Sequence, residues 1–195
     1  MREAELTGTT SGDLVAHRTL TLEAYADTIV PGEKRRPDDR AVAGAAPGGG
    51  AVAAGALELM QWDATGISEG LGDLVELLDG YTRSYAEEHG LTLDASVPPF
   101  VALDFAHRTA LVQRLTGPGH PEKELWVLLA LFSNMSFDSA AHRHTAEALA
   151  DGHPGLTAMG ITPPDADGLW RFGKPGYGTA LARRHPDTTP SGSPA

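Results

Sequence analysis

Histidines and carboxylates in the second half of the chain are spaced in a way that would allow proton transfer or metal binding. Asp138 and His142 are four residues apart and Asp104 and His107 are three apart, so each pair shares a face if its segment is helical. A carboxylate beside an imidazole can orient it as a general base, or both can ligate a metal. The alternative is a hydrogen-bonded polar pair within packed helices, and we favour it for Asp138 and His142.

A metal centre is the weakest of these three interpretations. His144 is two residues beyond His142, roughly 200° around a helix, so the two cannot bind one ion from the same face. A di-metal helical bundle needs Glu-x-x-His on two helices and two more inward acids, and only half of that set is available. We therefore expect no metal. If the pair is catalytic, His142 is the general acid or base, Asp138 orients it, and His107 and Tyr85 lie nearby.

Composition excludes several other classes of function. The chain has 195 residues without cysteine, which excludes disulfides, thiolate metal sites and cysteine nucleophiles. Gly48–Gly50 follows no strand and belongs to no phosphate-loop motif, so we expect no bound cofactor. The formal net charge of −11 argues against nucleic-acid partners. No apolar run approaches the ~20 residues of a membrane span, and no signal peptide is recognisable, so we expect a cytoplasmic protein.

The elements that carry these residues are predicted to be helices throughout. Apolar residues recur every three or four positions, and no segment alternates with period two, so the fold class is all-α. We expect an irregular bundle of about five main helices with long Gly- and Pro-rich connections and a loop-rich C-terminal segment. The expected helices are 21–30 with Thr21 as N-cap, 51–61, 67–89 with Gly90 after its end, 98–115 and 121–150.

The longest of these helices is also the most apolar. Residues 125–132 are apolar all round, which predicts a helix buried on every side. Residues 17–186 are expected to form one helical domain between a flexible arm at 1–16 and a flexible tail at 187–195.

A distinctive aromatic segment lies near the C-terminus. Trp170, Arg171 and Phe172 follow a turn-rich stretch that begins at Pro163. In a helical protein such a loop usually covers an opening of the core, which is the interpretation we favour here. It can instead contact a partner or a ligand.

One segment resembles a known family. Residues 22–32, Leu-Glu-Ala-Tyr-Ala-Asp-Thr-Ile-Val-Pro-Gly, are similar to the opening motif of the gluconate 2-dehydrogenase subunit 3 family. The similarity continues loosely to about residue 150, and residues 137–142 and 167–172 resemble an actinobacterial branch of that family. The resemblance implies a small helical subunit that accompanies a flavin-dependent dehydrogenase. Exported members carry a twin-arginine signal, but here Arg35-Arg36 follows the first helix with no apolar region behind it, so the expected partner is cytosolic.

Two functions therefore stand as hypotheses. The first is a non-catalytic accessory subunit of a flavin-dependent oxidoreductase of the glucose–methanol–choline type. The second is a stand-alone, cofactor-free tailoring enzyme of secondary metabolism, which acts on an apolar hydroxylated or polycyclic small molecule through Asp138 and His142.

Overall fold

The computed structural model describes residues 10–163 and residue 166, and this part of the chain is all-α, as the sequence predicts. No strand occurs among these residues, and none of their helices is both long and apolar enough to cross a bilayer. The helices are α1 (Ser11–Ile29), α2 (Ala56–Gln61), α3 (Leu71–Glu88), α4 (Pro99–Ala102), α5 (Phe105–Leu115), α6 (Lys123–Ser139), α7 (Thr145–Ala150) and α8 (Pro154–Ala158), with 3₁₀ turns at Asp63–Thr65 and Ser68–Gly70.

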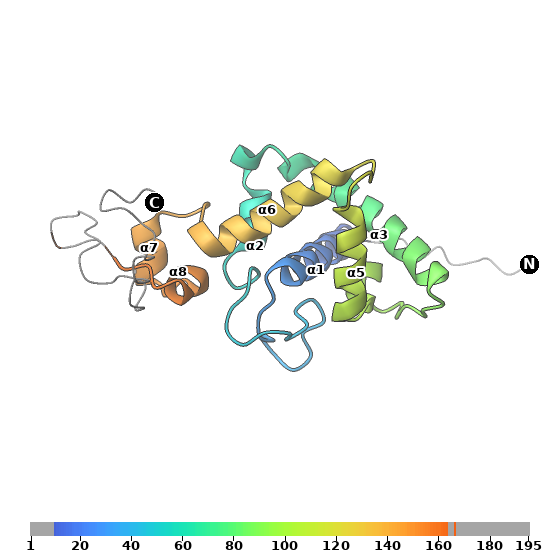
Figure 1. Cartoon of the computed structure of the whole chain (residues 1–195), viewed down its shortest axis with the longest axis horizontal. Helices are drawn as coiled ribbons and strands as arrows, with labels where there is room; N and C mark the ends of the chain where they lie inside the picture. The colour runs from blue at the N-terminus through green and yellow to red at the C-terminus, as the bar shows by residue number, and fades with distance from the viewer. Residues whose placement is uncertain (1–9, 164–165, 167–195) are drawn as a thin grey trace, which may run out of the picture.

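Helix α6 runs through the middle of the fold and packs against α1, α2 and α8. Helices α3 and α5 lie toward one end of the molecule, and α7 and α8 lie at the other (Figure 1). Tyr25, Phe100 and Trp126 form the aromatic centre of the core, with Tyr25 6.2 Å and 6.3 Å from the other two rings. The Tyr25 hydroxyl donates to the Trp126 carbonyl at 2.7 Å, and burial raises the pKa of that hydroxyl.

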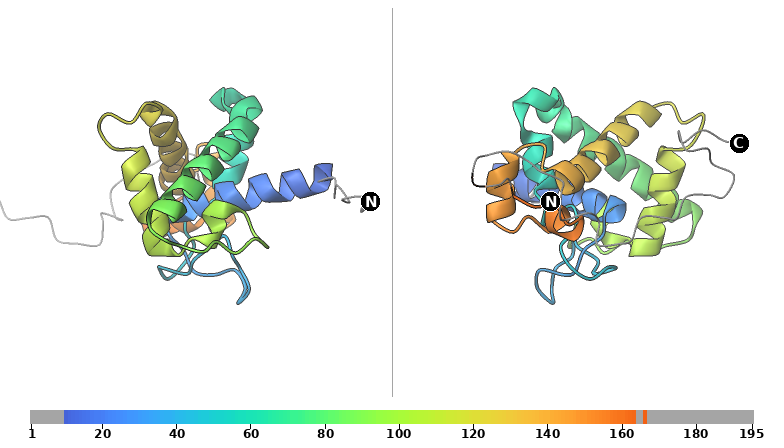
Figure 2. Two further views of the ribbon diagram at one scale, coloured as in Figure 1. Left: turned by 90° about the vertical axis from the view of Figure 1, so that its right-hand side faces the viewer. Right: turned by 60° about the vertical axis from the view of Figure 1, so that its left-hand side comes forward.

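The first helix begins ten residues before the predicted start. Thr10 is its N-cap: the Thr10 hydroxyl accepts from the Asp13 N–H at 3.2 Å, and the Asp13 carboxylate accepts from the Thr10 N–H at 3.0 Å. Thr21, the predicted cap, is instead buried inside the helix, where it donates to the His17 carbonyl at 2.9 Å. Residues 11–16, assigned to the arm, are therefore helical, and they project beyond the other helices (Figure 2).

The predicted helix 98–115 is two helices. Leu103 has an extended backbone, and Asp104 caps α5 by accepting from the His107 N–H at 2.8 Å. Asp104 and His107 are therefore cap and third residue of one helix start, not a pair on one helical face. The segment has a continuous helical periodicity, but the cap at Asp104 starts a new helix within it.

The predicted helix 121–150 is also two helices. Helix α6 ends at Ser139 because Ala140 adopts a left-handed conformation, with φ 48°, and α7 begins at Thr145. Ala140 is fully buried in a small apolar cluster with Ala148 and Leu156. Nearby, Gly155 of α8 lies so close to the Phe137 carbonyl that any side chain there would collide with it. Tertiary packing, not a helix-breaking residue, therefore ends α6.

Candidate functional site

His142 lies in the turn between α6 and α7. Its ring forms part of an open pocket of about 490 Å³, which Glu58, Arg143, Asp151 and His153 also line. The His142 Nδ1 is buried and has no hydrogen-bond partner among the described residues. Burial lowers the pKa of His142, and the charges of Arg143 and His153 act in the same direction, whereas Glu58 opposes them. These effects together favour the neutral form of this imidazole at the pocket wall.

Asp138 does not orient His142, so the predicted geometry of this pair is wrong. Asp138 is exposed on α6, whereas His142 follows the end of that helix, and the two do not share a helical face. The four-residue spacing would pair them only if the helix continued through Ala140, which leaves the helical conformation. The acid whose charge acts on His142, raising its pKa, is instead Glu58 from α2.

His153 fills a structural role in the same pocket. Its Nδ1 accepts from the Leu156 N–H at 3.3 Å, and its Nε2 donates to the Ala54 carbonyl at 3.1 Å. Both ring nitrogens of this buried side chain are satisfied, so it caps α8 and ties it to the segment before α2. The sequence signal for this role is His153-Pro154, a histidine directly before the proline that opens a helix.

Tyr85 and His107 do meet, as a pair of their own. The Tyr85 hydroxyl lies 3.0 Å from His107 Nδ1, and His89 stacks on the Tyr85 ring with centroids 4.0 Å apart. This cluster joins the end of α3 to the start of α5, whereas His142 lies in the turn before α7, and these helices lie toward opposite ends of the molecule (Figure 1). Tyr85 and His107 therefore cannot assist His142, although the prediction placed all three together.

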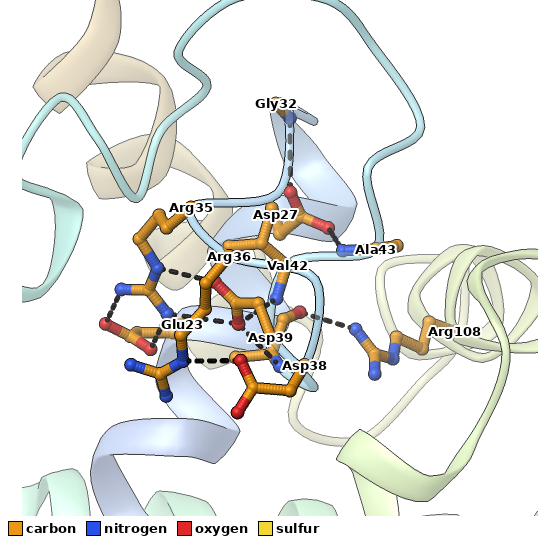
Figure 3. A network of polar contacts seen from close by, with 11 residues as sticks. Glu23, Asp27, Gly32, Arg35, Arg36, Asp38, Asp39, Val42, Ala43 and Arg108 are labelled. Atoms are coloured by element: carbon orange, nitrogen blue, oxygen red, sulfur yellow. Dashed lines mark hydrogen bonds and ion pairs between the residues drawn. The ribbon is translucent and has the colours of Figure 1, made fainter.

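A dense polar network anchors the charged loop that follows α1 (Figure 3). Asp27 is buried, and its carboxylate accepts from the Gly32 N–H at 3.1 Å and the Ala43 N–H at 2.8 Å. Burial raises the pKa of Asp27, although these bonds and the charge of Arg108 act against it. Gly32 also lies directly against the backbone of Gly50. The Asp and Gly of the 22–32 motif therefore shape this loop.

Arg35 and Asp39 form the centre of the same network. Arg35 binds both carboxylate oxygens of Glu23, at 2.6 and 2.7 Å, and donates to Asp39 at 2.6 Å. Burial alone would raise the pKa of Asp39, but bonds from Arg35 and from the Val42 and Ala41 N–H groups outweigh it and lower that pKa.

Arg108 completes the network from α5. Its buried guanidinium donates to the carbonyls of Leu103, Ala41, Arg40 and Val101. Burial lowers the pKa of Arg108 to about 10. Its side-chain hydrogen bonds all go to main-chain carbonyls, so we assign Arg108 to holding the loop rather than to chemistry.

Sequence reasoning missed a direct histidine–carboxylate contact. His17 Nε2 lies 2.7 Å from Asp79 Oδ2, and Arg83 lies 3.7 Å from the same oxygen. His17 is on α1 and Asp79 on α3, so no local spacing signals the pair. Within residues 10–163, no group of three or more histidine, aspartate or glutamate side chains is arranged to hold a metal ion.

Helix α6 presents large apolar side chains to solvent, contrary to the prediction that it is buried all round. Val127 and Leu131, one turn apart, are 43% and 49% exposed, and Leu125 is 40% exposed. Trp126 and Leu129, on the other side of the helix, are fully buried. The predicted contact residues Trp170, Arg171 and Phe172 lie outside the described residues, as does the predicted tail.

Comparison with known proteins identifies one family. Its model matches residues 16–195, and its description is a family of unknown function, DUF5987. No curated protein and no solved structure matches the chain.

Proposed function

The chain belongs to this family of unknown function, and we propose that it is a non-catalytic accessory subunit of a flavin-dependent oxidoreductase. The partner is of the glucose–methanol–choline type and carries the flavin. The observation that carries the proposal is the uncovered apolar face of α6.

That face is unusual for a helix at the centre of a fold. A helix that is apolar all round is normally covered on every side, and residues 125–132 are apolar throughout. Among the described residues, Val127 and Leu131 nevertheless remain open to solvent. Contiguous exposed apolar surface is typical of protein–protein interfaces. A partner that covers this side of α6 would complete the burial that the sequence of the helix indicates.

The resemblance of residues 22–32 to gluconate 2-dehydrogenase subunit 3 supports the identity of the partner. Members of that family accompany a flavoprotein dehydrogenase. Trp170, Arg171 and Phe172 are proposed as further contacts, since aromatic and arginine side chains dominate binding energy at interfaces.

The experiment is co-expression of the full chain with the flavoprotein oxidoreductase encoded nearest to it in its native genome. Leu131→Glu should reduce recovery of the complex by on the order of tenfold or more, because it places a charge in an apolar contact. The melting temperature of the Leu131→Glu chain alone should stay near that of the wild type, because the Leu131 side chain is half exposed. Leu14→Glu is the matched control, an exposed leucine on α1. Equal recovery of both variants and wild type would exclude α6 as the docking face.

The aromatic contacts are tested separately. Trp170→Ala with Phe172→Ala should weaken the complex while the helical circular dichroism signal is retained. Loss of helicity would instead show that these residues cover the core.

A stand-alone tailoring enzyme is the second candidate, favoured by the unpartnered His142 Nδ1 at the wall of its pocket. In such an enzyme His142 would be the general acid or base without help from Asp138. His142→Gln should then reduce turnover of an apolar hydroxylated substrate by roughly 10²–10⁴-fold, while the melting temperature at neutral pH stays unchanged. A lower melting temperature with full activity per folded molecule would assign His142 to structure.

A further inference from the structure

A second pocket is lined by residues of the projecting half of α1, of helix α3 and of the segment that joins α3 to α4. Its volume is about 600 Å³, within the range of small-molecule sites. Much of its wall is apolar and comes from Ala16, Leu20, Leu93, Val97, Pro98 and Pro99. This pocket is separate from the exposed face of α6 and from the His142 pocket.

The polar part of the pocket is the contact that joins α1 to α3. The His17 side chain is 35% exposed and lines the pocket, whereas the Asp79 side chain is 6% exposed and lies behind it. His17 Nε2 lies 2.7 Å from Asp79 Oδ2. In the tautomer in which Nε2 donates to this oxygen, Nδ1 of the ring is an acceptor. No described residue forms a hydrogen bond with that Nδ1. Asp79 Oδ1 is buried and likewise has no partner there.

Charge in the pocket distinguishes ligand classes. Asp13 and Asp94 also line the pocket. The Asp13 carboxylate accepts hydrogen bonds from Thr10, and the Asp94 carboxylate accepts them from Ser96 and Arg40. Arg83, in contrast, is largely exposed, and its ion pair with Asp79 is long, at 3.7 Å. Arg83 is the one lysine or arginine among the residues that line the pocket, and its guanidinium suits a carboxylate. An unprotonated His17 Nδ1 is an acceptor, which suits a hydroxyl.

We propose that this pocket binds a small aromatic hydroxy acid. Arg83 binds its carboxylate, His17 Nδ1 accepts from its hydroxyl, and the apolar wall covers its ring. Asp79 is a positioning residue, which fixes the tautomer and orientation of His17 without touching the ligand.

The test uses the full chain and two probes, 4-hydroxy-2-naphthoate, whose hydroxyl cannot reach its own carboxylate, and 2-naphthoate, with isothermal titration calorimetry. Arg83→Gln should weaken both probes by about tenfold or more, the effect of losing a charge-assisted bond. His17→Gln should weaken only the hydroxylated probe. Arg143→Gln, an arginine of the His142 pocket, is the matched control and should change neither affinity. The positively charged 1-naphthylmethylamine should not bind.

Nuclear magnetic resonance of the wild type provides a readout that does not depend on variants. Addition of 4-hydroxy-2-naphthoate should shift the amide signals of Ala16, Leu93 and Val97, and ¹⁵N shifts of the His17 ring should report the Nε2–H tautomer. Asp79→Asn should change that tautomer balance. The proposal fails if millimolar probe does not bind, if the amine binds equally well, or if Arg83→Gln and Arg143→Gln behave alike.

Discussion

The ring of His142 lies over the backbone of Gly55, with Nε2 2.5 Å from the position that a β-carbon on this glycine would occupy. Gly55 also has φ 88°, a conformation that residues with side chains rarely adopt. The glycine therefore permits both the entry into α2 and the position of the histidine.

Gly55→Ala should destabilise the fold by about 2 kcal/mol or more, because backbone strain of about 1–2 kcal/mol adds to the clash with His142. Gly66→Ala is the control, since Gly66 has φ 73° but open space around it. Urea unfolding measures both, and combining Gly55→Ala with His142→Ala should recover the steric part. Equal losses for Gly55→Ala and Gly66→Ala would show that the imidazole does not rest on this glycine.

The lowered pKa of His142 predicts a pH-dependent effect of its replacement. In the window below the ordinary histidine value, the unfolded chain binds more protons than the folded chain, so stability falls as the pH falls. His142→Gln removes this loss, so the variant should gain stability relative to wild type between about pH 7 and pH 5. Melting temperatures across that range test it, with exposed His144→Gln as control. A constant difference between variant and wild type would be inconsistent with a half-buried imidazole whose pKa is lowered.

Asp39 should behave in the opposite sense. Its lowered pKa means that its contribution to stability is present above the unfolded-state value and is lost as the pH falls through the folded-state value. Asp39→Asn should cost about 2 kcal/mol at neutral pH, because the charged partner of Arg35 is lost, and the deficit should shrink below about pH 4. Asp38→Asn, in the exposed pair with Arg36, should cost much less. Similar losses for both would remove the special role assigned to Asp39.

The sequence predicted those elements whose ends carry local signals. Helix α3 matches its apolar periodicity, and Gly90 after it has the expected positive φ, 64°. Helix α1 ends before Pro31 and α2 ends at Gln61, both as predicted. These limits depend on residues adjacent in sequence, which is why periodicity and turn residues were sufficient.

The errors arose where long-range packing decides the backbone. Ala140 is a good helix former, yet its burial against Ala148 and Leu156 holds it in a left-handed conformation, and this separates Asp138 from His142. The contact between His17 and Asp79 joins residues 62 positions apart, so no spacing rule could detect it. The prediction that Tyr85 and His107 lie near each other is confirmed by the structure. The prediction that both lie near His142 is wrong.

We propose that this chain works as a subunit bound to a flavoprotein. The most direct measurement is size-exclusion chromatography with light scattering on the co-expressed, purified pair, recording flavin absorbance across the peak. We predict one peak that contains both chains and the flavin, with a mass above that of the flavoprotein by a whole number of 20.4 kDa chains. Separate elution of the two proteins, with all flavin and full dehydrogenase activity in the flavoprotein alone, would contradict the account.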